Sequence, residues 1–191
     1  IHSNGAYEAG VYAQGFRLLD ALFMFGMIFA GLLFPIFSKQ LKTSVAVVLD
    51  LVKTSANLLL GGIIIIVFVT VCNASLILGW IYDDIQDAIG PFQFLMLGFF
   101  PIGMNFIFGT LLSANGNLKI LNSISAFGIV ANISINIMLI PDYGALGAAI
   151  ATFATQGLTA IAQFLYCVQK FKIPKKPNGV LKFLLLTAGL Y

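Results

Sequence analysis

Two side chains of opposite charge lie close together near the start of the chain, just before a long apolar run. Arg17 and Asp20 are three residues apart, so on a helix they share one face and can form an ion pair. A guanidinium group binds a diphosphate through paired hydrogen bonds, and ionisable residues within apolar segments are candidates for function. The alternative is structural: Arg17 extends to a membrane–water interface, or Asp20 merely neutralises it.

Two asparagines form a second candidate site. Asn132 and Asn136 are one helical turn apart on the same face of an apolar segment. Their amides could line a hydrophilic path and hydrogen-bond sugar hydroxyls, or they could bond neighbouring helices at roughly 0.5–2 kcal/mol per contact. The same two interpretations stay open for the other polar residues within apolar segments, which are Asn57, Asn105, Thr152, Thr155, Gln156 and Gln163.

An acidic string, Asp83, Asp84 and Asp87, has the spacing that binds magnesium diphosphate in prenyl-transferring enzymes. Carboxylates at this spacing suit a hard cation together with substrate phosphates. Such a site needs a second acidic cluster, however, and the sequence contains no other, so a solvated acidic loop is the better interpretation. No other pattern indicates a metal site, a cofactor or a set of catalytic residues.

The composition indicates a multi-pass membrane protein. The chain has 191 residues, of which 60% are hydrophobic and 9% charged, with a mean hydropathy of +1.00. Soluble domains contain about 25% charged residues. The net charge of +3 does not indicate nucleic-acid binding, because its distribution follows the membrane. We expect one partial domain, residues 1–191, within a longer protein, because the sequence starts at Ile1 and stops within a short apolar run.

The apolar segments predict an all-α transmembrane bundle, since a helix needs about 20 residues to cross a bilayer core. Residues 39–53 form an amphipathic connector that is expected to lie on the membrane surface. Pro101 should kink its helix, and Trp80 and Tyr82 suit the membrane–water interface. The predicted spans are residues 18–37, 56–78, 89–112, 122–140 and 145–168, followed by a truncated span at 180–191.

This span count separates the charges. The lysines fall on one side of the membrane, at positions 39, 42, 53, 119, 170, 172, 175, 176 and 182. The opposite side carries Glu8, Asp83, Asp84, Asp87 and Asp142. Because positive residues are retained on the inner side of a membrane, the lysine-rich loops are predicted to be cytoplasmic.

A tight helical hairpin is predicted around residues 141–144, whose sequence is Pro-Asp-Tyr-Gly. The helix that follows is rich in small residues, which allow membrane helices to approach closely. We therefore expect helix packing at Gly144, Gly147, Ala148 and Ala151.

Two motifs carry a resemblance to a known family. The first has the pattern Asn-x-x-x-Asn, then Ile-Pro-x-Tyr-Gly-Ala-x-Gly-Ala-Ala-Ile-Ala-Thr, and covers Asn132 to Thr152. The second runs from Ala9 and Tyr12 through Arg17 to Phe34-Pro35-x-x-Ser38. Both resemble bacterial polysaccharide flippases of the multidrug/oligosaccharidyl-lipid/polysaccharide exporter superfamily.

The resemblance implies a function and a setting. The chain would form most of the second lobe of a two-lobe exporter in the bacterial inner membrane, and the other lobe would come from an N-terminal half of the same protein. It would flip a polyprenyl-pyrophosphate-linked oligosaccharide by alternating access, for surface polysaccharide assembly, with membrane lipid as a further partner. Arg17, Asp20, Asn132 and Asn136 would then be candidate substrate-binding residues, and the chain would not be an enzyme.

Three alternatives remain. A cation-coupled multidrug exporter of the same superfamily would be favoured by a carboxylate deep within a span, and only Asp20 comes near this. A membrane prenyl-transferring enzyme would use Asp83, Asp84 and Asp87. A passive membrane anchor would not need the many polar side chains within the spans.

Overall fold

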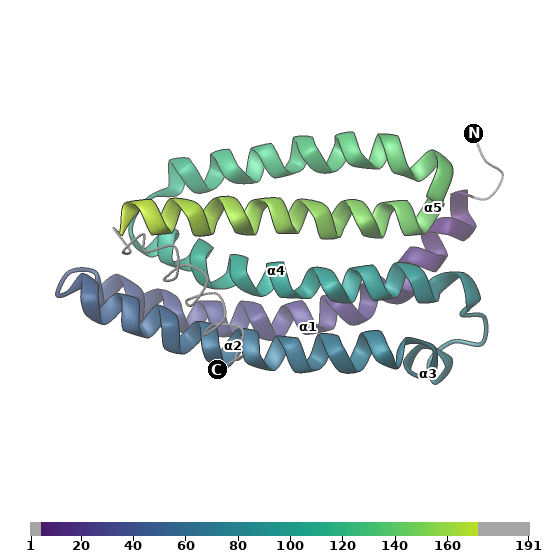
Figure 1. Cartoon of the computed structure of the whole chain (residues 1–191), viewed down its shortest axis with the longest axis horizontal. Helices are drawn as coiled ribbons and strands as arrows, with labels where there is room; N and C mark the ends of the chain where they lie inside the picture. The colour runs from purple at the N-terminus through teal and green to yellow at the C-terminus, as the bar shows by residue number, and fades with distance from the viewer. Residues whose placement is uncertain (1–4, 172–191) are drawn as a thin grey trace, which may run out of the picture.

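The structure, a computed structural model that describes residues 5–171, is a bundle of long helices (Figure 1). The elements are α1 (Gly5–Gln40), α2 (Val45–Cys72), α3 (Ala74–Gly79), a short 3₁₀ helix η1 (Gln86–Ala88), α4 (Ile89–Ala114) and α5 (Leu118–Lys170). The described part of the chain contains no strand. Helices α1, α2, α4 and α5 are each long and apolar enough to cross a membrane. The prediction of an all-α bundle is therefore confirmed for the described residues, and four of its helices suit a membrane by length and composition.

Helix α5 reverses direction at Gly144 and forms the predicted hairpin. Gly144 has φ 52° and ψ −128°, the only non-helical backbone conformation within α5. Glycine adopts a positive φ without the steric penalty that a Cβ atom brings. Figure 1 shows the two arms, residues 118–143 and 145–170, side by side. The reversal is tighter than the predicted four-residue turn, because residues 141–143 remain helical. Counting the arms separately gives five long helical segments.

Helix α4 forms the centre of the bundle and packs against α1, α2 and α5. Its most buried apolar side chains are Phe92, Leu95, Met96, Ile107, Leu111 and Leu112. Other helices expose large apolar side chains to their surroundings, for example Phe25, Phe68 and Met138. A buried central helix inside an apolar exterior is the arrangement expected where the solvent is lipid rather than water.

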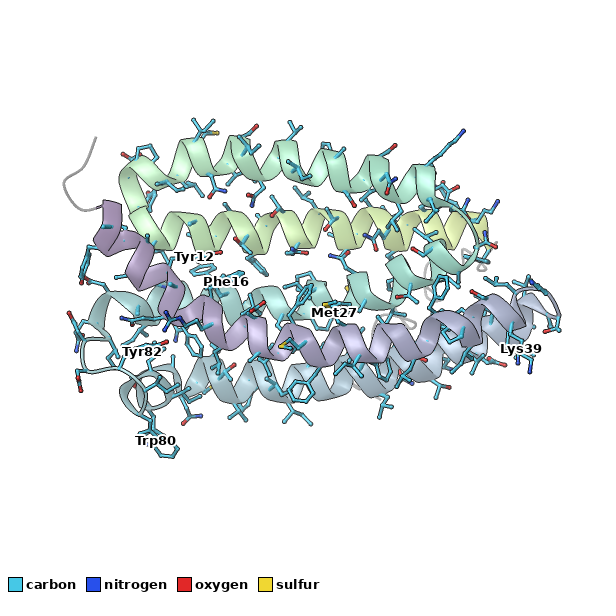
Figure 2. All side chains as sticks on the ribbon, turned by 180° about the vertical axis from the view of Figure 1, so that it is seen from behind. Tyr12, Phe16, Met27, Lys39, Trp80 and Tyr82 are labelled. Carbon is cyan, nitrogen blue, oxygen red and sulfur yellow. The ribbon has the colours of Figure 1, made fainter. Side chains whose placement is uncertain are left out.

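The charges separate along the bundle, as the alternation of helix directions requires. Lys39 lies in the last turn of α1, Lys119 in the first turn of α5, and Lys170 ends α5. These three helix ends lie at one end of the bundle (Figure 1). Figure 2 shows Trp80 and Tyr82 at the opposite end from Lys39. The acidic residues at 83, 84 and 87 follow Tyr82 directly. Lys172, Lys175, Lys176 and Lys182 lie outside the described residues, as does the predicted truncated span 180–191.

Two helix boundaries differ from the predicted ones. The predicted span 56–78 runs across Asn73, where α2 ends and the short α3 starts. Asn73 departs from helical backbone angles, with φ −116° and ψ 28°. Its side chain donates a hydrogen bond to the carbonyl oxygen of Val69 at 2.9 Å, alongside its own backbone N–H at 3.1 Å. The predicted surface connector 39–53 is instead a turn at residues 41–44 followed by a continuous α2 from Val45.

Candidate functional site

The strongest candidate site is an uncharged polar cavity between α1, α4 and the two arms of α5. It has a volume of about 580 Å³. Its polar side chains are Tyr12, Asn105, Ser125, Asn132, Thr152, Thr155, Gln156, Thr159 and Gln163, and its aromatic ones include Phe16, Phe23 and Phe106. None of the described residues that line it is Lys, Arg, Asp or Glu. We call this cavity the amide groove.

Hydrogen bonds across the groove connect its three walls. The Asn105 Nδ2 atom on α4 donates to Gln156 Oε1 at 2.9 Å and to Thr159 Oγ1 at 3.2 Å. The hydroxyls of Tyr12 on α1 and Thr152 on α5 are 3.2 Å apart. Figure 2 shows Tyr12 and Phe16 extending from α1 on the side that faces α5. The groove is thus built by contacts between helices that are far apart in the sequence.

One member of the predicted asparagine pair, Asn132, joins the arms of α5. Asn132 Nδ2 donates to Thr155 Oγ1 at 3.1 Å, and Asn136 Nδ2 donates to Asn132 Oδ1 at 2.9 Å. Asn132 lines the amide groove, whereas Asn136 lies one turn nearer the hairpin and supports Asn132. Asn132 therefore bonds the two arms and also borders the cavity, whereas Asn136 bonds Asn132 within the first arm.

Two of the four buried acceptor oxygens without a partner in the described residues belong to side chains that line the groove. Within residues 5–171, the buried side-chain oxygens that lack a hydrogen bond are Gln14 Oε1, Asn105 Oδ1, Asn136 Oδ1 and Gln163 Oε1. Asn105 and Gln163 line the groove. An unsatisfied buried acceptor costs about 1–3 kcal/mol. These oxygen atoms are themselves buried, so they do not open onto the cavity as the structure stands.

Two glycines give the groove its shape. A Cβ atom at Gly128 would lie 2.6 Å from Thr159 Cγ2, so Gly128 lets the arms of α5 approach each other. A Cβ atom at Gly26 on α1 would overlap the ring of Phe106. That ring in turn packs on Phe23, with the ring centroids 4.9 Å apart. The aromatic wall therefore depends on a small residue in α1.

Arg17 and Asp20 lie outside the amide groove. Both side chains are exposed, and no ion pair joins them or links either of them to another described residue. The buried positions of α1 include Val11, Gly15 and Leu19, which fall on the opposite side of the helix. The structure thus does not bring the predicted cationic candidate together with the asparagine pair.

A carboxylate that the sequence did not single out caps the second arm of α5. Glu8 Oε2 accepts a hydrogen bond from the Ala145 backbone N–H at 2.7 Å. The first N–H groups of a helix have no internal partner and favour a negative charge, so this contact anchors α1 to the hairpin. The sequence signal that could have indicated this contact is the start of a new helix after Gly144, because no capping side chain lies next to that start.

The acidic string lies at the surface, away from the groove. Asp83, Asp84 and Asp87 are exposed, and in the described part of the chain they do not form a group that could hold a metal ion. Tyr7, at the start of α1 before its apolar segment, donates a hydrogen bond to Asp87 Oδ2 at 2.7 Å. This bond holds the phenol proton and raises the pKa of Tyr7 to about 12.

The small residues of the hairpin lie where its arms approach. A Cβ atom at Gly147 would be 2.6 Å from the carbonyl oxygen of Leu139 on the first arm. Ala151 is fully buried, and Ala148 and Gly144 line a second cavity of about 630 Å³ beside Glu8 and Tyr12. Of the four residues predicted for helix packing, Gly147 meets the first arm directly, Ala151 is buried, and Gly144 and Ala148 border this second cavity.

Comparison with known proteins yields no match, whether with protein-family models, with curated proteins or with solved structures.

Proposed function

We propose that the chain is part of a membrane transporter that flips a polyprenyl-pyrophosphate-linked oligosaccharide across the bacterial inner membrane for surface polysaccharide biosynthesis. The amide groove carries this proposal. Its amides and hydroxyls lie midway along α4 and the second arm of α5, in helices long and apolar enough to cross a membrane. Polar groups at that depth are costly unless they bond one another or serve a passing polar solute. The flippase-like motifs of the sequence supply the substrate class.

The groove favours transport over the other functions that the sequence leaves open. A passive anchor does not need a polar cavity inside the bundle. The acidic string required for prenyl transfer is at the surface, away from the groove. A cation-coupled drug exporter is favoured by a carboxylate within a span, but Asp20 is exposed and outside the groove. A flippase for sugar-bearing lipids needs uncharged hydrogen-bonding groups, which the groove has.

In the proposed carrier, this bundle is one lobe of two, and its lysine-rich end faces the cytoplasm. Alternating access would expose the polar interior to each side of the membrane in turn. Arg17 and Asp20 lie on the outer side of α1, so their role in this scheme is to face the second lobe or the interface. Arg17→Ala and Arg17→Lys in the full-length protein, scored by surface polysaccharide, test whether that charge is needed.

A transport assay with a matched pair of variants tests the proposal. The full-length protein is reconstituted in liposomes with a fluorescent polyprenyl-pyrophosphate oligosaccharide, and the translocated fraction is measured by access of an added lectin. Asn132→Leu, which removes an amide from the groove, should slow translocation. Asn57→Leu is the control, because Asn57 is an exposed amide on α2 away from the groove. Translocation absent in the unmodified protein, or equal in the two variants, would count against the proposal.

A further inference from the structure

A single side chain separates the amide groove from the second cavity beside it. This second cavity, which we call the hairpin cavity, has a volume of about 630 Å³ and lies between the start of α1 and the hairpin of α5. Among the described residues, Tyr12 is the one that lines both cavities. On α5, Ala148 borders the hairpin cavity, and Thr152, one turn further along, borders the groove. The boundary between the two cavities therefore runs through the Tyr12 side chain.

One hydrogen bond and one ring contact hold Tyr12 at this boundary. The hydroxyl oxygens of Tyr12 and Thr152 are 3.2 Å apart. The Thr152 hydroxyl also donates to the carbonyl oxygen of Ala148 at 3.0 Å, and this bond uses its only proton, so Tyr12 donates its phenol proton to Thr152 Oγ1. The Tyr12 ring stacks on Phe16 at a centroid distance of 5.6 Å, and Phe16 is itself 41% exposed. A single bond between neutral groups is weaker than a charge-assisted one, so the phenol can leave this position.

The backbone around Tyr12 is fixed on both sides, so the movable part is its side chain. Glu8, one turn earlier on the same face of α1, accepts a hydrogen bond from the Ala145 backbone N–H at 2.7 Å and ties the helix to the hairpin. Tyr7 donates a hydrogen bond to Asp87 Oδ2 at 2.7 Å and ties the same turn of α1 to the 3₁₀ helix before α4. Rotation about the side-chain bonds of Tyr12 disturbs neither contact.

We propose that Tyr12 is a gate between the amide groove and the hairpin cavity. When the phenol turns away from Thr152, the two cavities join into one passage within this bundle. The exposed residues Gly5 and Tyr143 border the hairpin cavity, so the passage opens at the hairpin end, opposite to the end that holds Lys39 (Figure 1). The groove then exchanges water and small hydrophilic solutes with that side without movement of a second lobe. This inference deepens the proposed transport function, on which its role rests, by naming the contact that controls access to the groove.

Thiol labelling of the full-length protein in membrane vesicles tests the gate. Cys72 and Cys167 are replaced by Ser and Ala. Thr159→Cys then reports on the groove, two turns beyond Thr152, and Ala9→Cys reports on the hairpin cavity. The membrane-impermeant cation MTSET, a methanethiosulfonate, is added on the side from which Ala9→Cys is labelled, and the rate of each reaction is measured.

Tyr12→Phe removes the hydroxyl and keeps the ring, so the gate should open more often while the packing of the ring is retained. Labelling of Thr159→Cys should become about three- to tenfold faster, the change in population that one lost hydrogen bond gives, and faster still in Tyr12→Ala. Tyr7→Phe is the matched control, because it also deletes a hydrogen-bonded phenol hydroxyl of α1, and Tyr7 lines neither cavity. The labelling rate of Thr159→Cys in Tyr7→Phe, and that of Ala9→Cys in every variant, should be unchanged.

Three results would overturn the gate: an equal labelling rate with and without Tyr12→Phe, an equal increase in Tyr7→Phe, or no labelling of Thr159→Cys even in Tyr12→Ala. The liposome assay keeps the gate separate from the transport function. Gated labelling in a protein that does not flip lipid would refute the transport function and leave the gate standing, whereas lipid flipping with labelling that is independent of Tyr12 would refute the gate alone.

Discussion

The close approach of the two arms of α5 makes Gly147→Ala a sensitive test of the hairpin. The new Cβ atom would lie 2.6 Å from the Leu139 carbonyl oxygen, and ordinary contact begins at 3.4 Å, so the arms must separate by about 0.8 Å. The obstacle is backbone, which cannot turn aside as a flexible side chain does. Overpacking of this kind costs typically about 1–3 kcal/mol. The free energy of unfolding should fall accordingly.

Gly157→Ala is the matched control, because Gly157 lies on the same arm and a Cβ atom there meets nothing within 4 Å. Both variants gain helix propensity, worth roughly 0.5–1 kcal/mol in a helix interior. Their difference therefore isolates the clash. Equilibrium unfolding of the full chain in detergent micelles, followed by circular dichroism, should show Gly147→Ala as the less stable by about 1–3 kcal/mol. Equal stability, or a more stable Gly147→Ala, would mean that the arms do not pack as described.

Three further predictions concern the groove and the ends of the bundle. Asn105→Ala removes the hydrogen bonds to Gln156 and Thr159 and should lower stability by about 1 kcal/mol in the same unfolding assay; no change would show that these bonds are not formed. Cysteines at Lys42 and Asp84 should react with an impermeant maleimide from opposite sides of the membrane, and labelling of both from one side would contradict the span order. Trp80, the single tryptophan and 82% exposed, should be quenched by shallow lipid-borne quenchers and not by deep ones.

The sequence predicts the hairpin well because its signals are local. The turn at Gly144 follows from a residue that tolerates a positive φ, and the packing at Gly147 follows from the absence of a Cβ atom. The break at Asn73 was missed, since it is a change of backbone angles at one residue inside an apolar run. Hydropathy does not register such a change. The cap that Glu8 provides was missed for a different reason: its partner is 137 residues away.

The sequence does contain a signal for the side of α1 that faces the bundle, and that signal places Arg17 outside. In lipid, outward and inward residues are equally apolar: Met24 is 62% exposed and Leu19 only 3%. Hydrophobic periodicity therefore cannot reveal the inner side. Small residues can, because they permit close helix contacts: a Cβ atom at Gly15 would lie 3.0 Å from a backbone atom of α4, and Gly26 accommodates a ring of the same helix. At about 100° per residue, Gly15 and Gly26 share one side, and Arg17 is turned about 200° from Gly15. The glycines thus place Arg17 outside the interior of this bundle, which leaves the groove lined by uncharged polar and apolar side chains.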